Sequence, residues 1–151
     1  DLCAAVGLAQ IRKYESSMLP ERKVLFDTYN QAFAQYEWAM LPPMSDEQCS
    51  SAFHLYQLRL DGIDEQARNE MMRMIAADGL GVNVHYVPLP MLTLFKRLGC
   101  DIQDHPNAFR LYQNELTLPV YNNLAVGDVQ RVAESVIKAQ SKVVIASQTT
   151  S

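Results

Sequence analysis

The sequence lacks the cysteine spacing that disulfide frameworks and zinc sites need. Its three cysteines, Cys3, Cys49 and Cys100, are an odd number and form no CxxC pair. We expect each to be a small buried apolar residue in a reducing compartment. The opening DLCAAVGLAQIRKY lacks the basic region of a signal peptide, and no apolar run approaches the roughly 20 residues of a membrane span. These absences predict a cytoplasmic protein with no membrane partner.

Positive charge is also scarce. The 13 Lys and Arg are scattered and outnumbered by 17 Asp and Glu, which leaves a net charge of -4. A nucleic-acid partner is therefore not expected, because such partners are bound by clustered basic residues. The 151 residues are 48% hydrophobic, enough for one domain with a core of its own.

Catalytic signatures are missing as well. The sequence contains no GxxxxGK[ST], GxGxxG, GxSxG or HExxH motif. Its three histidines, His54, His85 and His105, are too dispersed for a metal site, and His54 is expected to be structural, packed between sheet and helix. All five lysines fall on charged helical faces or ends, where a lysine stays solvated and unreactive. We therefore predict no catalytic, cofactor-binding or metal-binding residue in this chain.

What is present is a regular alternation of helical and extended patterns. Apolar residues at helical spacing, with Pro20 at a helix start and Gly79 at a helix end, delimit the helices. The order predicts an α+β layered domain, a small sheet covered by helices. We expect helices at 1–14, 20–36, 64–78, 91–98, from 105 onward and 126–140, strands at 53–60, 81–87 and 116–121, and a loop at 38–51.

The first and last helices carry the strongest apolar patterns. Val129, Val132, Val136 and Ile137 follow an i, i+3, i+7, i+8 repeat, so the last helix should dock firmly. The first helix is apolar nearly all round, which calls for burial on more than one side. No loop or strand precedes it, and this abrupt start favours a fragment of a longer protein.

Four stretches in order carry a family resemblance. They are DLCAAVGLAQI at 1–11, FHLY to RL at 53–60, GVNVHYVPL at 81–89, and PNA through LPVY to DV at 106–129. Together they resemble the C-terminal portion of the DegT/DnrJ/StrS family of nucleotide-sugar aminotransferases. Each motif alone is weak, but their order and spacing cover nearly the whole chain.

The resemblance implies the small C-terminal domain of an aspartate-aminotransferase-like (fold type I) enzyme, with a mainly antiparallel sheet. Residues 1–142 would form that domain, with helix 1–14 leading out of a large domain that this chain lacks, and residues 143–151 would be a loose tail. The full-length parent would be a homodimer that uses pyridoxal phosphate to transfer an amino group from glutamate to a nucleotide-linked keto-sugar. Such sugars serve lipopolysaccharide, capsule, glycan or antibiotic pathways.

The family's cofactor-binding lysine, its acidic partner for the pyridine nitrogen and most of its phosphate contacts would lie upstream of Asp1, so the chain alone should be inactive. Substrate-binding residues carry over only at His85 and Tyr86, with Asn83 a weaker neighbour, because this strand end borders the family's sugar-nucleotide pocket. The family often has His after Pro-Leu, where this chain has Pro90. Two alternatives stay open: a non-catalytic DegT-like regulator and a stand-alone ligand-binding α+β module.

Overall fold

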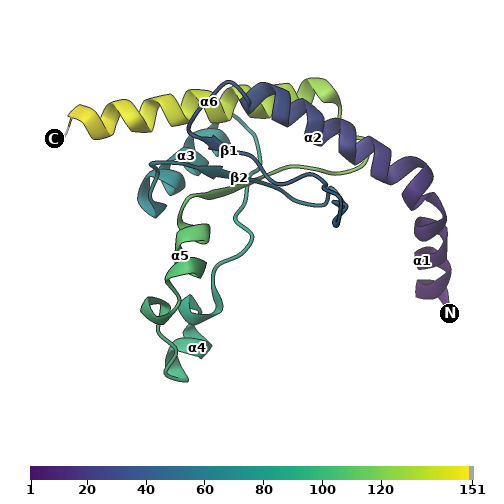
Figure 1. Ribbon diagram of the computed structural model, residues 1–151, viewed down its shortest axis with the longest axis horizontal. Coiled ribbons are helices and arrows are strands. Elements are labelled where there is room, and N and C mark those ends of the chain that lie inside the picture. Colours follow the sequence, from purple (N-terminus) through teal and green to yellow (C-terminus); the bar gives the residue numbers. More distant parts are fainter. Residues whose placement is uncertain (150–151) are drawn as a thin grey trace.

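A three-stranded sheet beneath a layer of helices makes up the centre of the protein, in a computed structural model that describes residues 1–149 (Figure 1). The strands are β1 (Ala39–Met40), β2 (Tyr56–Leu60) and β3 (Glu115–Leu118), in the order β1-β2-β3. Both neighbouring pairs are antiparallel. The predicted α+β class, with an antiparallel sheet covered by helices, is confirmed.

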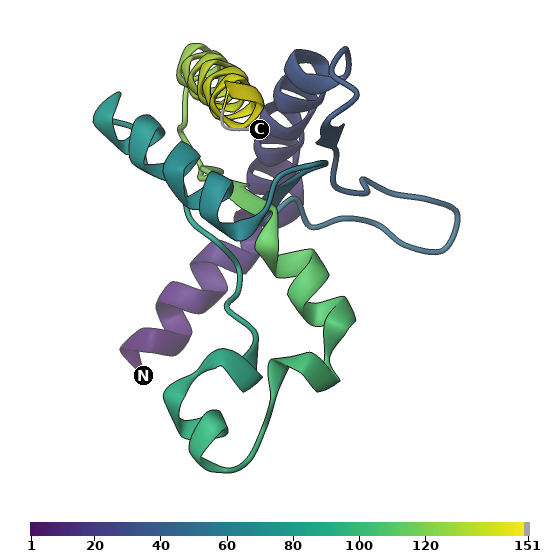
Figure 2. The same cartoon turned by 90° about the vertical axis from the view of Figure 1, so that its left-hand side faces the viewer.

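Three long helices cover the sheet, and shorter ones extend away from it. Figure 2, a view along α6, shows α6 lying between α2 and α3. The helices α4 and α5 form an arm that hangs below the sheet in Figure 1, and α1 bends away at the opposite end through a π-helical turn at Tyr14–Met18. The α-helices are α1 (Leu2–Lys13), α2 (Leu19–Phe33), α3 (Glu65–Ala77), α4 (Thr93–Arg97), α5 (Pro106–Gln113) and α6 (Val126–Thr149).

The ends of α3 show how the sequence sets element boundaries. At its start the Asp64 carboxylate accepts a hydrogen bond of 2.8 Å from the backbone N–H of Ala67, which satisfies a donor that the first helical turn leaves free. At its end Gly79 adopts a φ of +78°, a left-handed conformation that costs glycine little. The helix predicted at 64–78 is confirmed.

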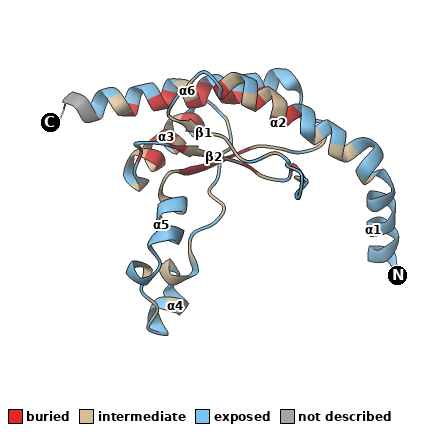
Figure 3. Cartoon of the chain, viewed as in Figure 1, coloured by how far each residue is buried: buried red, intermediate tan, exposed pale blue. Residues whose placement is uncertain are grey.

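The core lies between the helix layer and one face of the sheet. Alternate strand residues point to it, namely Tyr56, Leu58 and Leu60 from β2 and Leu116 and Leu118 from β3. Buried residues of α2, α3 and α6 pack on them, whereas α1, α4 and α5 contain none (Figure 3). In α6 the predicted inward residues Val129, Val132 and Val136 are buried, and Ile137 is partly buried.

Aromatic rings join α2 to β2 in this core. Phe26 lies 5.0 Å from Tyr56 and 5.3 Å from Phe53, in edge-on contacts typical of aromatic pairs. The chain's single tryptophan, Trp38, extends the cluster at the start of β1, with its ring 6.1 Å from that of Phe33. The hydroxyl of Tyr56 donates to the Asn30 side chain at 2.7 Å, which satisfies the polar end of a fully buried ring.

Three expectations about elements are wrong. Residues 81–87 are not a strand, since only Asn83 pairs with the sheet, through Thr117. The Asn83 side chain accepts from the N–H of Val84 at 2.8 Å, and such local bonds draw the backbone out of a ladder. The loop expected at 38–51 contains the short strand β1. The tail is not loose as far as Thr149, because α6 continues through it with Val143 buried against the core; residues 150 and 151 lie outside the described residues.

Expectations about burial also need correction. Cys3 and Cys49 are exposed and Cys100 is only partly buried, because they lie on elements that nothing in the chain covers. His54 is exposed, although it was expected to be packed between sheet and helix. The helix predicted at 1–14 is present as α1, but every residue from 1 to 13 is exposed, so the domain covers neither side of it.

Candidate functional site

The face of the sheet that points away from the helices is polar. Gln57 and Arg59 alternate with the buried apolar residues of β2, and Glu115 and Thr117 alternate with the leucines of β3. The register pairs Gln57 with Thr117 and Arg59 with Glu115. Directly opposed residues of antiparallel strands have neighbouring side chains, so these four groups form one polar cluster.

The chain from Asn83 to Tyr86 crosses this polar face. It leaves the sheet edge after the bridge between Asn83 and Thr117, in which each residue donates its N–H to the other's carbonyl. The N–H of His85 then donates to Glu115 Oε2 at 2.9 Å, and the Gln57 amide donates to the His85 carbonyl at 2.7 Å. Side chains of β2 and β3 thus hold His85 against the polar face of these two strands.

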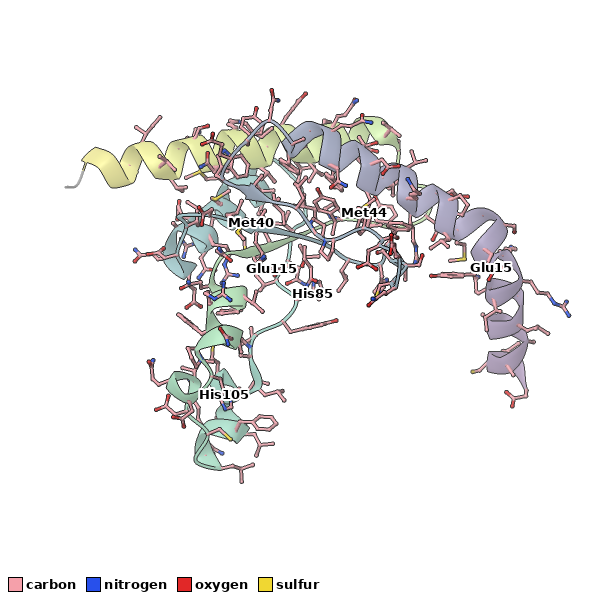
Figure 4. The ribbon with its side chains drawn as sticks, viewed as in Figure 1. Glu15, Met40, Met44, His85, His105 and Glu115 are labelled. Atoms are coloured by element: carbon pink, nitrogen blue, oxygen red, sulfur yellow. The ribbon has the colours of Figure 1, made fainter. Side chains whose placement is uncertain are left out.

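A pocket of about 450 Å³ opens beside His85. Its floor is the polar sheet face, and its walls come from α5, from the segment after β1 and from the segment around Tyr86. Figure 4 shows His85 and Glu115 side by side under the sheet, with His105 apart on the arm. The lining residues are Leu41, Pro42, Pro43, Gln57, Arg59, His85, Tyr86, Pro88, Ala108, Leu111, Tyr112 and Glu115.

Two buried charged groups support the pocket. Glu115 is 4% exposed, and burial raises the pKa of its carboxyl, an effect that hydrogen bonds from Thr117 and from the His85 N–H oppose. Arg68 of α3 is 1% exposed; it donates to the Glu115 carbonyl at 3.1 Å and to the Tyr112 carbonyl at 3.3 Å. Its guanidinium also lies 4.8 Å from the centre of the Tyr112 ring. Arg68 therefore fixes the end of α5 to the start of β3.

Of the predicted substrate-binding residues, two reach the pocket. His85 and Tyr86 both line it, with their rings edge-on at 4.6 Å, and the Tyr86 side chain is 73% exposed. Asn83 does not line it; its side chain bonds locally to Val84 and borders a neighbouring hollow together with His54. The backbone leaves the sheet between Asn83 and His85, and both residues border that neighbouring hollow.

The four other lining residues with polar side chains were not singled out as site residues from the sequence: Gln57, Arg59, Tyr112 and Glu115. Two of the predicted strands did contain a sequence pattern that indicates a polar face. In both YQLRL and ELTL polar residues alternate with large apolar ones, which indicates one polar face on each strand. The burial of that face could not be read from either strand, since the covering segment comes from elsewhere in the chain.

The pocket does not fit pyridoxal phosphate as a covalently held cofactor. That attachment needs a lysine, and none lines the pocket. The five lysines are all exposed, as predicted. Within residues 1–149 no group of three His, Cys, Asp or Glu side chains is placed to hold a metal ion, and no helix is long and apolar enough to cross a membrane.

Comparison with known proteins connects this site to one family. Residues 1–137 match the profile of the DegT/DnrJ/EryC1/StrS aminotransferase family. The spore coat polysaccharide biosynthesis protein SpsC of Bacillus subtilis is 32% identical over 141 residues, which are 90% of this chain and 35% of that protein. The UDP-4-amino-4,6-dideoxy-N-acetyl-beta-L-altrosamine transaminase of Campylobacter jejuni is 26% identical over 143 residues, covering 95% of this chain and 37% of that protein.

Solved structures give the same result. The PMP-form of the putative sugar aminotransferase Spr1654 from Streptococcus pneumoniae superposes with a TM-score of 0.90 at 34% identity, over 96% of this chain and 36% of that one. The Helicobacter pylori aminotransferase PseC superposes with a TM-score of 0.75 at 25% identity, over 89% of this chain and 36% of that one. The predicted small domain of an aspartate-aminotransferase-like fold is confirmed. This chain, which spans about a third of the length of these relatives, belongs to the DegT/DnrJ/EryC1/StrS aminotransferase family.

Proposed function

We propose that this chain is the C-terminal part of a pyridoxal-phosphate aminotransferase that transfers an amino group from glutamate to a keto-sugar carried on a nucleotide. Family membership over residues 1–137 supports this, as do relatives named as sugar aminotransferases. The single observation in this chain that carries the proposal is the pocket where His85 and Tyr86 meet above a polar sheet face. The product would enter polysaccharide, lipopolysaccharide, glycan or antibiotic-sugar biosynthesis.

The chemistry of the pocket suits a sugar nucleotide. Arg59 offers a guanidinium, which binds phosphate oxygens in a fork geometry. The largely exposed ring of Tyr86 offers an apolar face with a hydroxyl at its end, a combination that packs on sugars and bases. His85 and Gln57 add polar groups that hydroxyls can reach. Asn83, which lies outside the pocket, would act at most through the backbone that it positions.

The covalent chemistry would come from the rest of the protein. A lysine outside this chain would bind the cofactor, and this chain would bind and orient the acceptor sugar. We further propose a homodimer in the cytoplasm. The three cysteines, all unpaired, are in keeping with a reducing compartment.

Half-reaction kinetics of the whole protein test the proposed acceptor site. His85→Ala should lower kcat/KM of the half-reaction with the sugar nucleotide at least about tenfold and change the glutamate half-reaction little, since truncation removes contacts to one substrate only. Tyr86→Phe should cause a smaller loss, because the ring remains. His105→Ala, an exposed histidine on the arm, is the matched control. Equal losses in both half-reactions would show a general folding role instead.

The 151-residue chain itself should be inactive. Mixing it with pyridoxal phosphate and reducing with borohydride should give only sparse, scattered modification, because all five lysines are exposed and none adjoins the pocket. Mass spectrometry of the digested protein reads the result. One lysine modified stoichiometrically would contradict the assignment of the cofactor site to the rest of the protein.

A further inference from the structure

A continuous hydrogen-bonded chain runs from a buried carboxyl to the pocket. His85 Nδ1 lies 2.9 Å from Thr117 Oγ1, and Thr117 Oγ1 is hydrogen-bonded in turn to Glu115 Oε1. The other carboxyl oxygen, Oε2, accepts from the backbone N–H of His85. Within the described part of the chain, His85 Nε2 has no hydrogen-bond partner, and the His85 side chain borders the pocket.

Proton counting along this chain allows two arrangements. A threonine hydroxyl has one proton, so Thr117 donates to one neighbour and accepts from the other. When Glu115 is ionised, Thr117 donates to it, and His85 must then donate from Nδ1, which leaves Nε2 as an acceptor. When Glu115 carries a proton, that proton sits on Oε1, since Oε2 faces an N–H. Glu115 then donates to Thr117, Thr117 donates to Nδ1, and the His85 proton is on Nε2.

We propose that Glu115 and Thr117 form a proton relay that sets which nitrogen of His85 is protonated, and so decides whether the pocket meets a hydrogen-bond acceptor or a donor. A proton taken up at Nε2 is balanced by transfer of the Nδ1 proton to Thr117 and of the Thr117 proton to Glu115. No bond between heavy atoms changes. The net result is a neutral histidine and a neutral buried carboxyl. Glu115 and Thr117 are positioning residues that act through His85.

The surroundings of Glu115 allow both states. Its burial favours the neutral carboxyl, whereas the hydrogen bonds from Thr117 and the His85 N–H, together with the charge of Arg68, favour the ionised one. Arg68 of α3 donates to the Glu115 carbonyl, and Arg59 of β2 is its cross-strand partner. From α5, the Tyr112 hydroxyl turns to Glu65 of α3 and away from the relay.

Because the relay needs no ligand, its test does not depend on the proposed function. In the 151-residue chain labelled at its three histidines, NMR shifts of the ring nitrogens report which nitrogen carries the proton, and His54→Gln and His105→Gln assign the remaining signal to His85. On acidification, His85 should change from the neutral form protonated on Nδ1 to the neutral form protonated on Nε2 before the doubly protonated ring appears. Direct conversion to the doubly protonated ring, or a single tautomer throughout, overturns the proposal.

Substitutions test each link separately. Glu115→Gln should hold neutral His85 in the form protonated on Nε2 at every pH where the ring is neutral, because the new amide must donate to Thr117 while its oxygen accepts from the His85 N–H. Thr117→Ser should preserve the change of tautomer and Thr117→Val should abolish it, since only serine keeps the hydroxyl. Glu134→Gln, on the exposed side of α6, is the matched control. If Glu115→Gln fails to fold, the titration of the wild-type protein still decides the question.

Discussion

Arg68 is a fully buried guanidinium that donates to two backbone carbonyls and, from Nε, to the Asn69 side chain. Its ion pair with Glu65 spans 3.9 Å and Glu65 is 35% exposed, so that pair contributes little. The bonds to the carbonyls of Tyr112 and Glu115 satisfy acceptors at a point where the chain turns from α5 into β3. Burying a charge is stabilising only when its hydrogen bonds are made, so this side chain acts as a connector between three elements.

We expect Arg68→Met to lower the free energy of unfolding by about 3 kcal/mol, because it removes the donor to the buried Glu115 carbonyl, one of two donors to the Tyr112 carbonyl, and the contact with the Tyr112 ring. Arg73→Met is the matched control on the same helix. Its side chain is 71% exposed, so the change should stay within about 0.5 kcal/mol. Urea denaturation measures both, and equal effects would contradict the role of Arg68.

The raised pKa of Glu115 predicts how stability depends on pH. A carboxyl whose pKa is higher in the folded protein than its ordinary value of 4.5 stabilises the fold below that value, and this contribution is lost as pH rises through the folded pKa. The stability of the wild type relative to Glu115→Gln should therefore fall as pH increases above 4.5. Urea midpoints of both proteins across that range provide the measurement, with Glu134→Gln as control for the loss of charge. A difference that grows with pH would show the opposite sign of shift.

Among the helices and strands, α6 links the other two long helices, because it packs on both α2 and α3. It is also linked to the end of α3, where Ser135 donates to the Asp78 carboxylate at 2.9 Å and Lys138 lies 3.4 Å from it. The apolar stripe of α6 continues beyond the predicted end at 140 to Val143. The helix therefore covers the whole length of the core.

Val136→Ala should cost about 2 kcal/mol of unfolding free energy, because it removes two methyl groups from a fully buried position and leaves a cavity. Val126→Ala makes the same chemical change at the first residue of α6, where the side chain is 42% exposed, and should cost far less. Thermal or urea unfolding of the pair reads the difference. Similar losses at both positions would mean that α6 is not anchored through this stripe.

Elements with a strong periodic pattern of apolar residues could be predicted from the sequence. Elements whose conformation depends on contacts with distant segments of the chain could not. The period of α6 and the cap residues of α3 are local properties, so α3 and the start and inward face of α6 were predicted correctly, whereas α6 extends beyond its predicted end. Residues 81–87 have the composition of a strand, but the Asn83 side chain and the Glu115 carboxylate take over the backbone donors that a strand would use. The strand β1 has only two residues, too few to show an alternation of polar and apolar side chains.

The same distinction holds for the site. His85 and Tyr86 were found through the family motif, whereas Glu115 lines the pocket and Thr117 contacts His85 only because the chain at 83–86 folds over them. Cys3 was expected to be buried because of its residue type, and it is exposed because α1 has no partner surface in this chain. Contacts between distant segments of the chain decide which residues form the site and whether Cys3 is buried. A single sequence does not reveal those contacts.

For the whole molecule, the most unusual feature is α1, which extends away from the domain (Figure 1). Its large apolar side chains are exposed to water. Leu2 is 82% exposed and Ile11 is 74% exposed, and Val6 and Leu8 lie between them. Several exposed large apolar side chains on one helix favour association. A lone amphipathic or apolar helix of 12 residues is also close to the limit of stability in water.

We therefore expect the 151-residue chain to associate with copies of itself through residues 2–11, or to lose the helical structure of α1 when it is monomeric. Light scattering across a dilution series measures the association, and Leu8→Glu should weaken it by placing a charge in the apolar surface. Gln10→Glu adds the same charge at another exposed position of α1 and is the matched control. A monodisperse monomer whose first helix is fully protected from hydrogen exchange would contradict both expectations.

The position of Trp38 has a practical consequence for all of these measurements. As the chain's single indole, it stands where α2, the turn after it and β1 meet, within 5.2 Å of the Tyr36 ring and 6.1 Å of the Phe33 ring. Its fluorescence emission will report on the packing between α2 and β1. The arm formed by α4 and α5 and the projecting α1 contain no tryptophan, so their unfolding will not change this emission. Comparing the emission of Trp38 with circular dichroism would separate loss of the central domain from melting of its extensions.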